Sequence, residues 1–195
     1  GEAQAAYMAS SGEAWAASSQ DFDSLLFGAP RLVRNLNITG RRKMPGTKEY
    51  RDISIELIEL PKVLESNGLH SREQLIDLAI LIGTDYNPGI RGIGPKKGLK
   101  LIQQHGDLES ALHSIGESIP QAECVQDIFL RSERAEVPPL EWRKPDREKI
   151  VDFLSRDHGF SEGRITAALD RLDGNKKHPK KAEMPRSQVS LDRWA

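Results

Sequence analysis

The stretch Leu78-Ala-Ile-Leu-Ile-Gly-Thr-Asp85-Tyr-Asn-Pro-Gly-Ile-Arg91-Gly-Ile-Gly94-Pro95-Lys96-Lys97 joins an apolar helix, an acid, a glycine-rich turn and a cationic helix start. The apolar residues before Asp85 lie all round the helical circle, which predicts a core helix that delivers a carboxylate to its own end. Gly92 and Gly94 permit positive φ and a close approach of backbone to a ligand. Pro95 suits the first position of a new helix, whose free N–H groups attract phosphate. We expect DNA backbone to meet a metal site here.

Lysines add charge to this helix start, at Lys96, Lys97 and Lys100, and no acid occurs between Asp85 and Asp107. The alternative is a plain connection between two helices with solvated lysines. A Gly-x-Gly motif alone would leave that alternative ahead, because short glycine motifs have many false matches. The glycines, Pro95, the lysines and the preceding buried helix together favour binding of the DNA backbone.

Composition limits the remaining possibilities. A chain of 195 residues with 37% hydrophobic content can bury one good core and a smaller satellite. Its net charge of -1 argues against a uniformly basic nucleic-acid binder, so local cationic patches matter more. Cys124 is the only cysteine, which excludes an intramolecular disulfide and favours a reducing compartment. No apolar run approaches the roughly 20 residues needed to cross a bilayer, and no secretory signal is visible.

The pattern along the chain predicts an α/β fold in which mixed strands and helices give way to helices alone. Strands are expected at 14–18, 31–38 and 53–60, the last two separated by a polar loop that holds Arg41, Arg42 and Lys43. Helices are expected at 2–11, 21–27, 61–67, 71–82, 95–104, 107–115, 146–157 and 161–172, the last with a Ser161 N-cap. After Gly174 the chain is basic and has too few apolar residues to fold.

Asp21 and Asp23 are two residues apart and follow the first expected strand. In an extended segment that spacing puts both carboxylates on one face. Hard cations such as Mg²⁺ take carboxylate oxygens, and a pair of metal ions assists phosphodiester hydrolysis. A helix N-cap followed by a solvated acid explains the spacing of Asp-x-Asp equally well. Glu2 and Asp85 are further candidates, with a surface helix acid and a turn residue as their respective alternatives.

The segment Gly83 to Lys97 closely resembles the helix-three-turn-helix of the flap endonuclease family of structure-specific 5′ nucleases. The resemblance extends to Gly1-Glu-Ala-Gln-Ala-Ala, to Gln20-Asp-Phe-Asp-Ser-Leu-Leu-Phe-Gly, to His158-Gly-Phe-Ser-Glu-Gly-Arg-Ile165 and to a motif at Gln188. Nearly the whole chain is covered, and it looks like an archaeal member. The implied fold is the second half of a PIN-like 5′-nuclease mixed sheet domain, with a helix-three-turn-helix DNA-binding cluster and a disordered C-terminal tail.

The resemblance assigns the acids to a metal site. Glu2, Asp21, Asp23 and Asp85 fall on acids that bind the family's two divalent metals, Mg²⁺ with Mn²⁺ as the alternative. The chain begins with Gly1 rather than Met, and its first helix has no lead-in. We therefore expect an absent upstream segment that carries another metal-site glutamate, further aspartates and the helical arch of the family. This departure leaves open whether the chain cleaves DNA by itself.

The same resemblance assigns residues to DNA contacts. Gly92, Gly94, Lys96 and Lys97 would touch the backbone of one duplex arm, which fixes position without reading bases, and Lys100 is a further DNA-binding candidate because of its charge on the same helix. Two further assignments are a K⁺ site formed by backbone carbonyls of Gly89, Ile90 and Ile93, and a pocket for a one-nucleotide 3′ flap formed by Phe160, Ser161 and Arg164. His158 and Gly163 differ from the residues commoner in that pocket. Ordinary helix packing is the alternative for Phe160.

The last residues, Gln188-Val-Ser-Leu191-Asp-Arg-Trp194-Ala195, follow the spacing by which short tails dock on a sliding clamp such as PCNA. One turn would gather Leu191 and Trp194 as a hydrophobic plug, with Gln188 as a polar anchor. Ala195 replaces the usual second aromatic residue and predicts reduced affinity. A disordered end with a stray tryptophan is the alternative.

These observations predict a flap endonuclease that acts in Okazaki-fragment maturation and repair, in an intracellular location that is cytoplasm or nucleoid if archaeal and nuclear if eukaryotic. Related alternatives are a 5′ exonuclease and a repair endonuclease that cuts bubbles. A second class is a fragment that binds branched DNA and the clamp but cuts nothing. The expected organisation is a nuclease core at 1–70, the DNA-binding region at 71–118, completing helices at 119–174 and the clamp-binding tail at 175–195.

Overall fold

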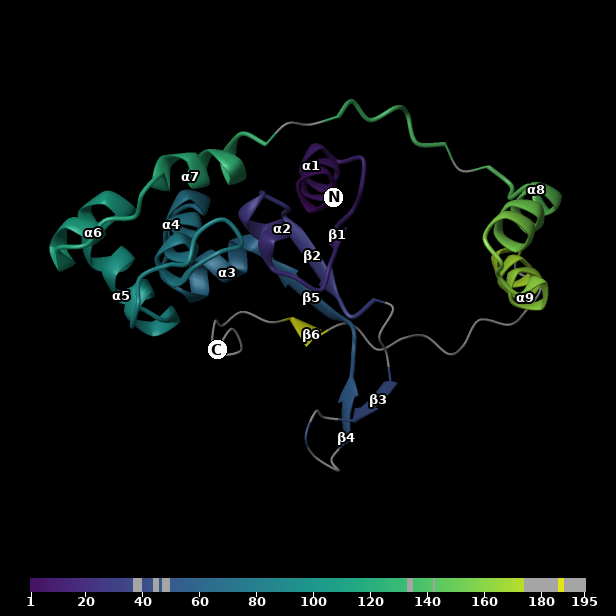
Figure 1. Cartoon of the computed structure of the whole chain (residues 1–195), viewed down its shortest axis with the longest axis horizontal. Helices are drawn as coiled ribbons and strands as arrows, with labels where there is room; N and C mark the ends of the chain where they lie inside the picture. The colour runs from purple at the N-terminus through teal and green to yellow at the C-terminus, as the bar shows by residue number, and fades with distance from the viewer. Residues whose placement is uncertain are drawn as a thin grey trace. The chain divides into compact units, whose positions relative to one another are not determined.

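The computed structural model describes residues 1–36, 40–43, 46, 50–132, 135–141, 143–173 and 186–187, and the fold is given for these residues. The chain divides into two compact units (Figure 1). One comprises Gly1–Val137 and a short strand, β6 (Arg186–Ser187), and the other lies within Pro138–Met184. The clamp-motif residues Gln188, Leu191, Trp194 and Ala195 lie outside the described residues.

The first part of the larger unit is α/β with a small mixed sheet, as the sequence predicts. Its elements are α1 (Glu2–Ser11), β1 (Ala17–Ser18), α2 (Asp23–Leu26), β2 (Arg31–Arg34) and β5 (Glu56–Glu59). The strand order is β1-β2-β5-β6, with β1 parallel to β2 and β2 antiparallel to β5. Leu32 and Ile58 are cross-strand partners and are both fully buried, so the hydrophobic pattern fixes this register.

The expectation of a strand at 14–18 is correct only for its last two residues. Ala17 is buried, whereas Trp15 is 61% exposed and lies before the strand begins. The strand is short because β1 is at the edge of the sheet and pairs with β2 through Ala17 and Ser18 alone. Alanine and serine have little β preference of their own, so this pairing sets the boundary.

The expectation of a polar loop between 38 and 53 is wrong in part. Within it, β3 (Gly40–Lys43) and β4 (Tyr50–Ile53) form an antiparallel ribbon, which includes Arg41, Arg42 and Lys43. The residues between β2 and β5 thus contain a second strand pair, which lengthens the predicted hairpin (Figure 1). Polar strands without apolar alternation give no sequence signal, because that signal comes from burial of one face.

Five helices complete the larger unit: α3 (Leu60–Ser66), α4 (Arg72–Ile82), α5 (Pro95–His105), α6 (Leu108–Ile115) and α7 (Ala122–Leu130). The boundaries of α4, α5 and α6 agree with the sequence prediction within about two residues, while α7 was not predicted individually. Five apolar side chains of α4 are buried in the core, which confirms that this helix is a core element; they are Leu75, Ile76, Leu78, Ile80 and Leu81.

The buried carboxylate of Asp77 joins three of these helices. It is 4% exposed and accepts hydrogen bonds from the backbone N–H of Leu108 at 3.1 Å and from the side chain of Gln126. Burial raises the pKa of Asp77 above its ordinary value, and the two hydrogen bonds oppose that rise. Asp77 thereby links α4 to the start of α6 and to α7.

We predict that Asp77→Asn lowers the free energy of unfolding by about 1–3 kcal/mol at acid pH, because the amide cannot accept both hydrogen bonds. A carboxyl group whose pKa is higher in the folded than in the unfolded state stabilises the fold below its unfolded pKa, and this stabilisation is lost as the pH rises through its folded pKa. The wild-type protein loses this stabilisation and the asparagine variant does not. The difference in free energy of unfolding between the two proteins should therefore narrow as pH rises. Urea unfolding over a pH series measures it, and a deficit that stays constant contradicts the assignment.

The smaller unit contains α8 (Arg147–Val151), a π-helical turn η1 (Asp152–Asp157) and α9 (Glu162–Leu172). The helix expected at 146–157 therefore exists but changes to π geometry after its first turn. Arg147 joins the two ends of the unit through ion pairs to Asp170 at 2.6 Å and Asp173 at 2.7 Å. No helix in the described part of the chain is both long and apolar enough to span a bilayer.

Candidate acid cluster and DNA-binding turn

The tertiary structure brings the four predicted acids into one electrostatic environment. Glu2 begins α1, Asp21 lies between β1 and α2, Asp23 begins α2, and Asp85 follows α4. Burial raises the pKa of Asp23, and the charges of Glu2, Asp85 and Asp21 raise it further, in that order. Two acids that are distant in sequence, Glu2 and Asp85, thus act on the Asp23 carboxylate together with its neighbour Asp21.

Ser19 connects two of these acids, and sequence reasoning missed it. Its hydroxyl donates a hydrogen bond to Oε1 of Glu2 and accepts one from the backbone N–H of Asp21 at 3.1 Å. The bridge ties the first turn of α1 to the loop that follows β1. A serine after a strand is too common to be a signal, so only the folded chain identifies this contact.

The donor chemistry of the four acids fits a hard divalent cation. All four offer carboxylate oxygens, and their mutual repulsion is what a cation such as Mg²⁺ relieves. Yet no three His, Cys, Asp or Glu side chains among the described residues already stand in a metal-binding arrangement.

A tight turn holds Asp85 at the end of α4. Thr84 and Asn87 form a backbone bridge, with the Thr84 N–H donating to the Asn87 carbonyl at 2.9 Å. The Asn87 amide also donates to the carbonyl of Ile80 at 2.8 Å, and Asn87 is buried. These bonds fix the backbone on both sides of Asp85, so the direction of its carboxylate depends on the turn.

The glycine-rich segment folds back against α4. Gly89 has a φ of +69°, and a Cβ added there would lie 2.3 Å from the carbonyl oxygen of Ile82. Ile90 N–H donates to the Leu81 carbonyl at 2.9 Å, and Ile93 N–H donates to the Ile90 carbonyl at 3.0 Å. Glycine is therefore required at position 89 by both conformation and space, a requirement the sequence analysis did not assign.

The start of α5 presents unpaired backbone donors and exposed cations. Gly94 is the N-cap and has no capping side chain, while Pro95 occupies the first turn as the sequence predicts. Lys96, Lys97 and Lys100 are exposed, and the ammonium of Lys97 donates to the Gly92 carbonyl at 3.1 Å. Gly98, on the opposite face, is buried; a Cβ there would lie 2.9 Å from Cδ1 of Leu78. The lysine side of α5 thus faces solvent.

The predicted 3′-flap residues belong to the smaller unit. Phe160 is 59% exposed, so its ring is not packed into the core of that unit. Ser161 is the N-cap of α9, as predicted, but its hydroxyl makes no capping bond. Arg164 lies in the first turn of α9, and its backbone N–H donates to the Ser161 carbonyl at 3.0 Å.

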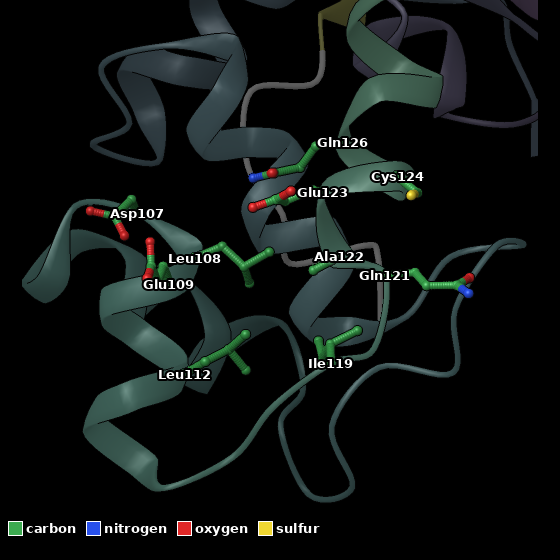
Figure 2. Close-up of a pocket in the computed structure, with 10 residues that line it drawn as sticks. All are labelled: Asp107, Leu108, Glu109, Leu112, Ile119, Gln121, Ala122, Glu123, Cys124 and Gln126. Atoms are coloured by element: carbon green, nitrogen blue, oxygen red, sulfur yellow. The ribbon is translucent and has the colours of Figure 1, made fainter.

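A pocket of about 570 Å³ lies elsewhere, between α6 and α7 (Figure 2). Residues within 107–112 and 119–126 line it, with Leu108, Leu112 and Ile119 as its apolar part. None of the predicted metal, DNA, K⁺ or 3′-flap residues belongs to this lining. The four acids therefore lie outside this pocket.

Comparison with known proteins gives consistent matches. Residues 1–85 match the XPG I-region family. Flap endonuclease 1 of Methanocella arvoryzae is 50% identical over 173 residues, which covers 88% of this chain and 51% of that protein. Flap endonuclease 1 of Methanococcoides burtonii is 44% identical over 194 residues, which covers 100% of this chain and 55% of that protein.

A solved structure matches as well. The flap endonuclease-1 from Methanococcus jannaschii has 36% sequence identity and a TM-score of 0.69, and the match covers 88% of this chain and 50% of that one. The chain therefore spans about half the length of the relatives it matches.

Proposed function

We propose that the chain is part of a flap endonuclease and that it serves hydrolysis of a phosphodiester at the base of a 5′ flap, because it matches enzymes of that kind in sequence and in structure. The observation that carries the proposal is that Ser19 joins Glu2 to the Asp21 backbone by two hydrogen bonds, and that the charges of Glu2, Asp21 and Asp85 all raise the pKa of Asp23. A divalent metal site needs several carboxylates near one another, which this part of the chain supplies.

In this proposal Glu2, Asp21, Asp23 and Asp85 hold two divalent metal ions, Mg²⁺ with Mn²⁺ as the alternative. When bound, such ions supply hydroxide from water and stabilise the leaving oxygen. The chain's own contribution is orientation. Ser19 holds the Glu2 carboxylate and the Asp21 backbone, and the Thr84–Asn87 bridge holds the backbone beside Asp85.

DNA binding is proposed for the turn between α4 and α5, in the helix-three-turn-helix arrangement of the family. The uncapped start of α5 and the exposed Lys96, Lys97 and Lys100 suit phosphate, and Gly92 and Gly94 let the backbone approach it. Backbone carbonyls of Gly89, Ile90 and Ile93 are the proposed K⁺ ligands. Such contacts position a duplex without reading its sequence, which suits an enzyme that recognises branched structure.

The exposed ring of Phe160, with Ser161 and Arg164, is the proposed acceptor of a one-nucleotide 3′ flap. The proposed biological role is Okazaki-fragment maturation and DNA repair inside the cell. A related 5′ exonuclease or bubble-cutting activity uses the same acids and the same turn, so product size on defined substrates distinguishes these activities.

Clamp binding is proposed for Gln188, Leu191, Trp194 and Ala195. We predict that Trp194→Ala abolishes binding to a sliding clamp and leaves flap-DNA binding unchanged, because the indole is the largest apolar group of the plug. Titration calorimetry against the clamp measures this. Clamp affinity equal to wild type would remove the motif from consideration.

Cleavage of a 5′-labelled double-flap DNA in Mg²⁺ and K⁺ tests the main proposal. A product of one discrete size is the expected result. The second candidate function is a DNA- and clamp-binding module that does not cut, and the uncapped start of α5 with its exposed lysines favours it, because these groups bind phosphate without a metal ion. DNA that is bound but uncut supports this second candidate, and failure to bind flap DNA contradicts both.

A further inference from the structure

We propose that Arg34 is the positioning residue of the acid cluster, which it serves by fixing the loop that carries Asp21 and Asp23. The inference rests on the proposed function for its purpose and on contacts within the chain for its evidence. Arg34 ends strand β2, beside the end of β1. It has no charge partner among the four acids in the described contacts, so its role is geometric.

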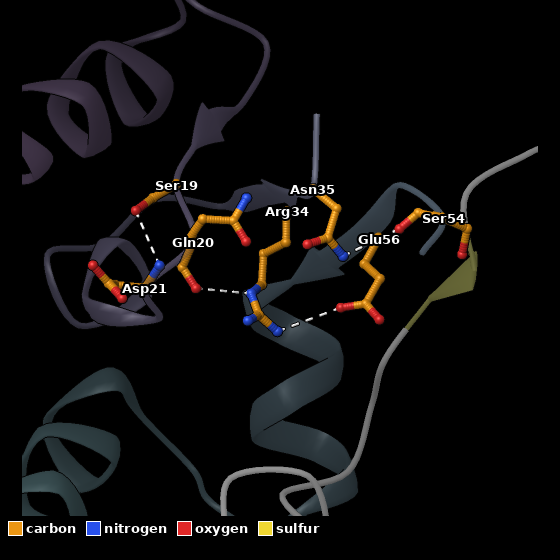
Figure 3. A network of polar contacts seen from close by, with 7 residues as sticks. All are labelled: Ser19, Gln20, Asp21, Arg34, Asn35, Ser54 and Glu56. Atoms are coloured by element: carbon orange, nitrogen blue, oxygen red, sulfur yellow. Dashed lines mark hydrogen bonds and ion pairs between the residues drawn. The ribbon is translucent and has the colours of Figure 1, made fainter. Parts of the chain in front are cut away.

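The Arg34 guanidinium makes two contacts with this loop and a third with β5, and Figure 3 shows the two polar ones, to Gln20 and Glu56. Nε of Arg34 donates to the carbonyl oxygen of Gln20 at 3.0 Å. The guanidinium carbon lies 4.2 Å from the centroid of the Phe22 ring, over its face. One terminal nitrogen pairs with Glu56 on β5 at 3.4 Å. Gln20 and Phe22 precede and follow Asp21 in the sequence, so Arg34 contacts the chain on both sides of that acid.

The loop needs such a support because the sheet ladder stops before it. The β1–β2 pairing includes Ala17 and Ser18, and Ser19 N–H donates to the Val33 carbonyl at 3.3 Å as its last bond. Beyond this point the Asp21 N–H is held by a side chain, the Ser19 hydroxyl. Asp21 therefore depends on side-chain contacts for its orientation, and Arg34 supplies those on the β2 side.

The position of Arg34 is itself fixed. The side chains of Arg34 and Glu56 are 22% and 16% exposed, so the pair is partly shielded from solvent. The next residue, Asn35, has a φ of +60° and donates from its amide to the Ser54 carbonyl at 3.1 Å. Asparagine tolerates this left-handed conformation, and the bond fastens the end of β2 to the start of β5 (Figure 3).

A second arginine of the same strand supplies a matched control. Arg31, at the start of β2, donates from Nε to the Trp15 carbonyl at 2.8 Å, and its guanidinium lies 4.9 Å from the Trp15 ring centroid. Arg31 thus makes the same two kinds of contact as Arg34, but at the end of β1 away from the acids. The two arginines thus contact the chain at opposite ends of β1, and only Arg34 contacts the loop that leads to Asp21 and Asp23.

The contacts of Arg34 require a planar guanidinium. Its Nε–H, its terminal nitrogen and its flat face serve three partners at once, whereas a lysine ammonium is a single charge without a face. We expect Arg34→Lys to keep the charge and lose the geometry. Arg31→Lys makes the same chemical change at the opposite end of β1.

Amide hydrogen exchange of the metal-free chain tests the proposal. Arg34→Lys should raise exchange at the Asp21 amide, whose N–H is held by the Ser19 hydroxyl, by about tenfold, because loss of the Arg34 hydrogen bond to Gln20 allows local opening. Arg31→Lys should leave exchange at this amide within about twofold of wild type. Equal acceleration by both variants, or none by Arg34→Lys, overturns the proposal.

Two additions keep the test decisive. If Arg34→Lys does not fold, Glu56→Gln replaces it, because this variant removes the ion pair that holds Arg34 to β5. It should accelerate exchange at the Asp21 amide to a smaller extent. Mn²⁺ broadening of the Asp21 and Asp23 amide signals gives a spectroscopic readout, and Arg34→Lys should need several-fold more Mn²⁺ for half-broadening. Wild type without any broadening contradicts the proposed metal role, while the exchange result still decides the role of Arg34.

Discussion

In an intact enzyme of the proposed function, Asp23→Asn is expected to abolish flap cleavage, with a fall of at least about 100-fold, while flap-DNA affinity stays within a few-fold of wild type. The carboxylate is the one on which three other acids act, and loss even of an outer-shell partner costs a metal site up to about 100-fold. DNA affinity is preserved because the lysines and free N–H groups of α5 are untouched. A gel assay with labelled flap DNA measures cleavage, and a variant that cuts at full rate removes Asp23 from the metal site.

The same substitution should stabilise the metal-free chain at neutral pH. Burial and three like charges raise the pKa of Asp23 in the fold. The wild-type fold is therefore stabilised by Asp23 only below the unfolded pKa of this group, and it loses that stabilisation as the pH rises through the folded pKa. The asparagine variant has no titrating group at this position and does not lose it. Mg²⁺ should raise the melting temperature of wild type and leave that of the variant unchanged, because only wild type gains by binding. A variant less stable than wild type in metal-free buffer contradicts the repulsion.

Gly89→Ala is expected to lower the free energy of unfolding by at least about 3 kcal/mol and to abolish DNA binding. The new Cβ would lie 2.3 Å from the Ile82 carbonyl oxygen, and that oxygen is backbone at the end of α4, which cannot move without distorting the helix. The φ of +69° adds strain for any residue with a side chain. The turn must then open, and it carries both Asp85 and the approach to α5.

Gly94→Ala is the control for this prediction. Gly94 has a φ of −104° and no neighbouring atom within 4 Å of an added Cβ, so Gly94→Ala should lower the free energy of unfolding by only about 1 kcal/mol, the cost of alanine at an N-cap. Urea unfolding of both variants gives the comparison. Similar losses in the two variants would show that chain entropy rather than the contact with Ile82 accounts for the effect.

The boundaries of α4 and α5 were predictable because local signals define them. Pro95 fixes the first turn of α5, and a run of apolar residues before Gly83 marks a helix buried on every side. The β3–β4 ribbon and the shortness of β1 were not predictable, because partner strands rather than their own residues set their limits. The π-helical turn after α8 was hidden for a similar reason: helical periodicity does not separate α from π geometry over six residues.

Residue types indicate the chemistry of the candidate site: four carboxylates, a glycine-rich turn and a cationic helix start, each of which suits metal or phosphate. That Glu2, Asp21 and Asp85 act on Asp23, and that Ser19 and Arg34 hold the loop around Asp21, is visible only in the folded chain. This division arises because residue type sets what a side chain can bind. Convergence of distant side chains depends on sheet register, on the path of the turn after α4, and on contacts that have no fixed spacing along the chain.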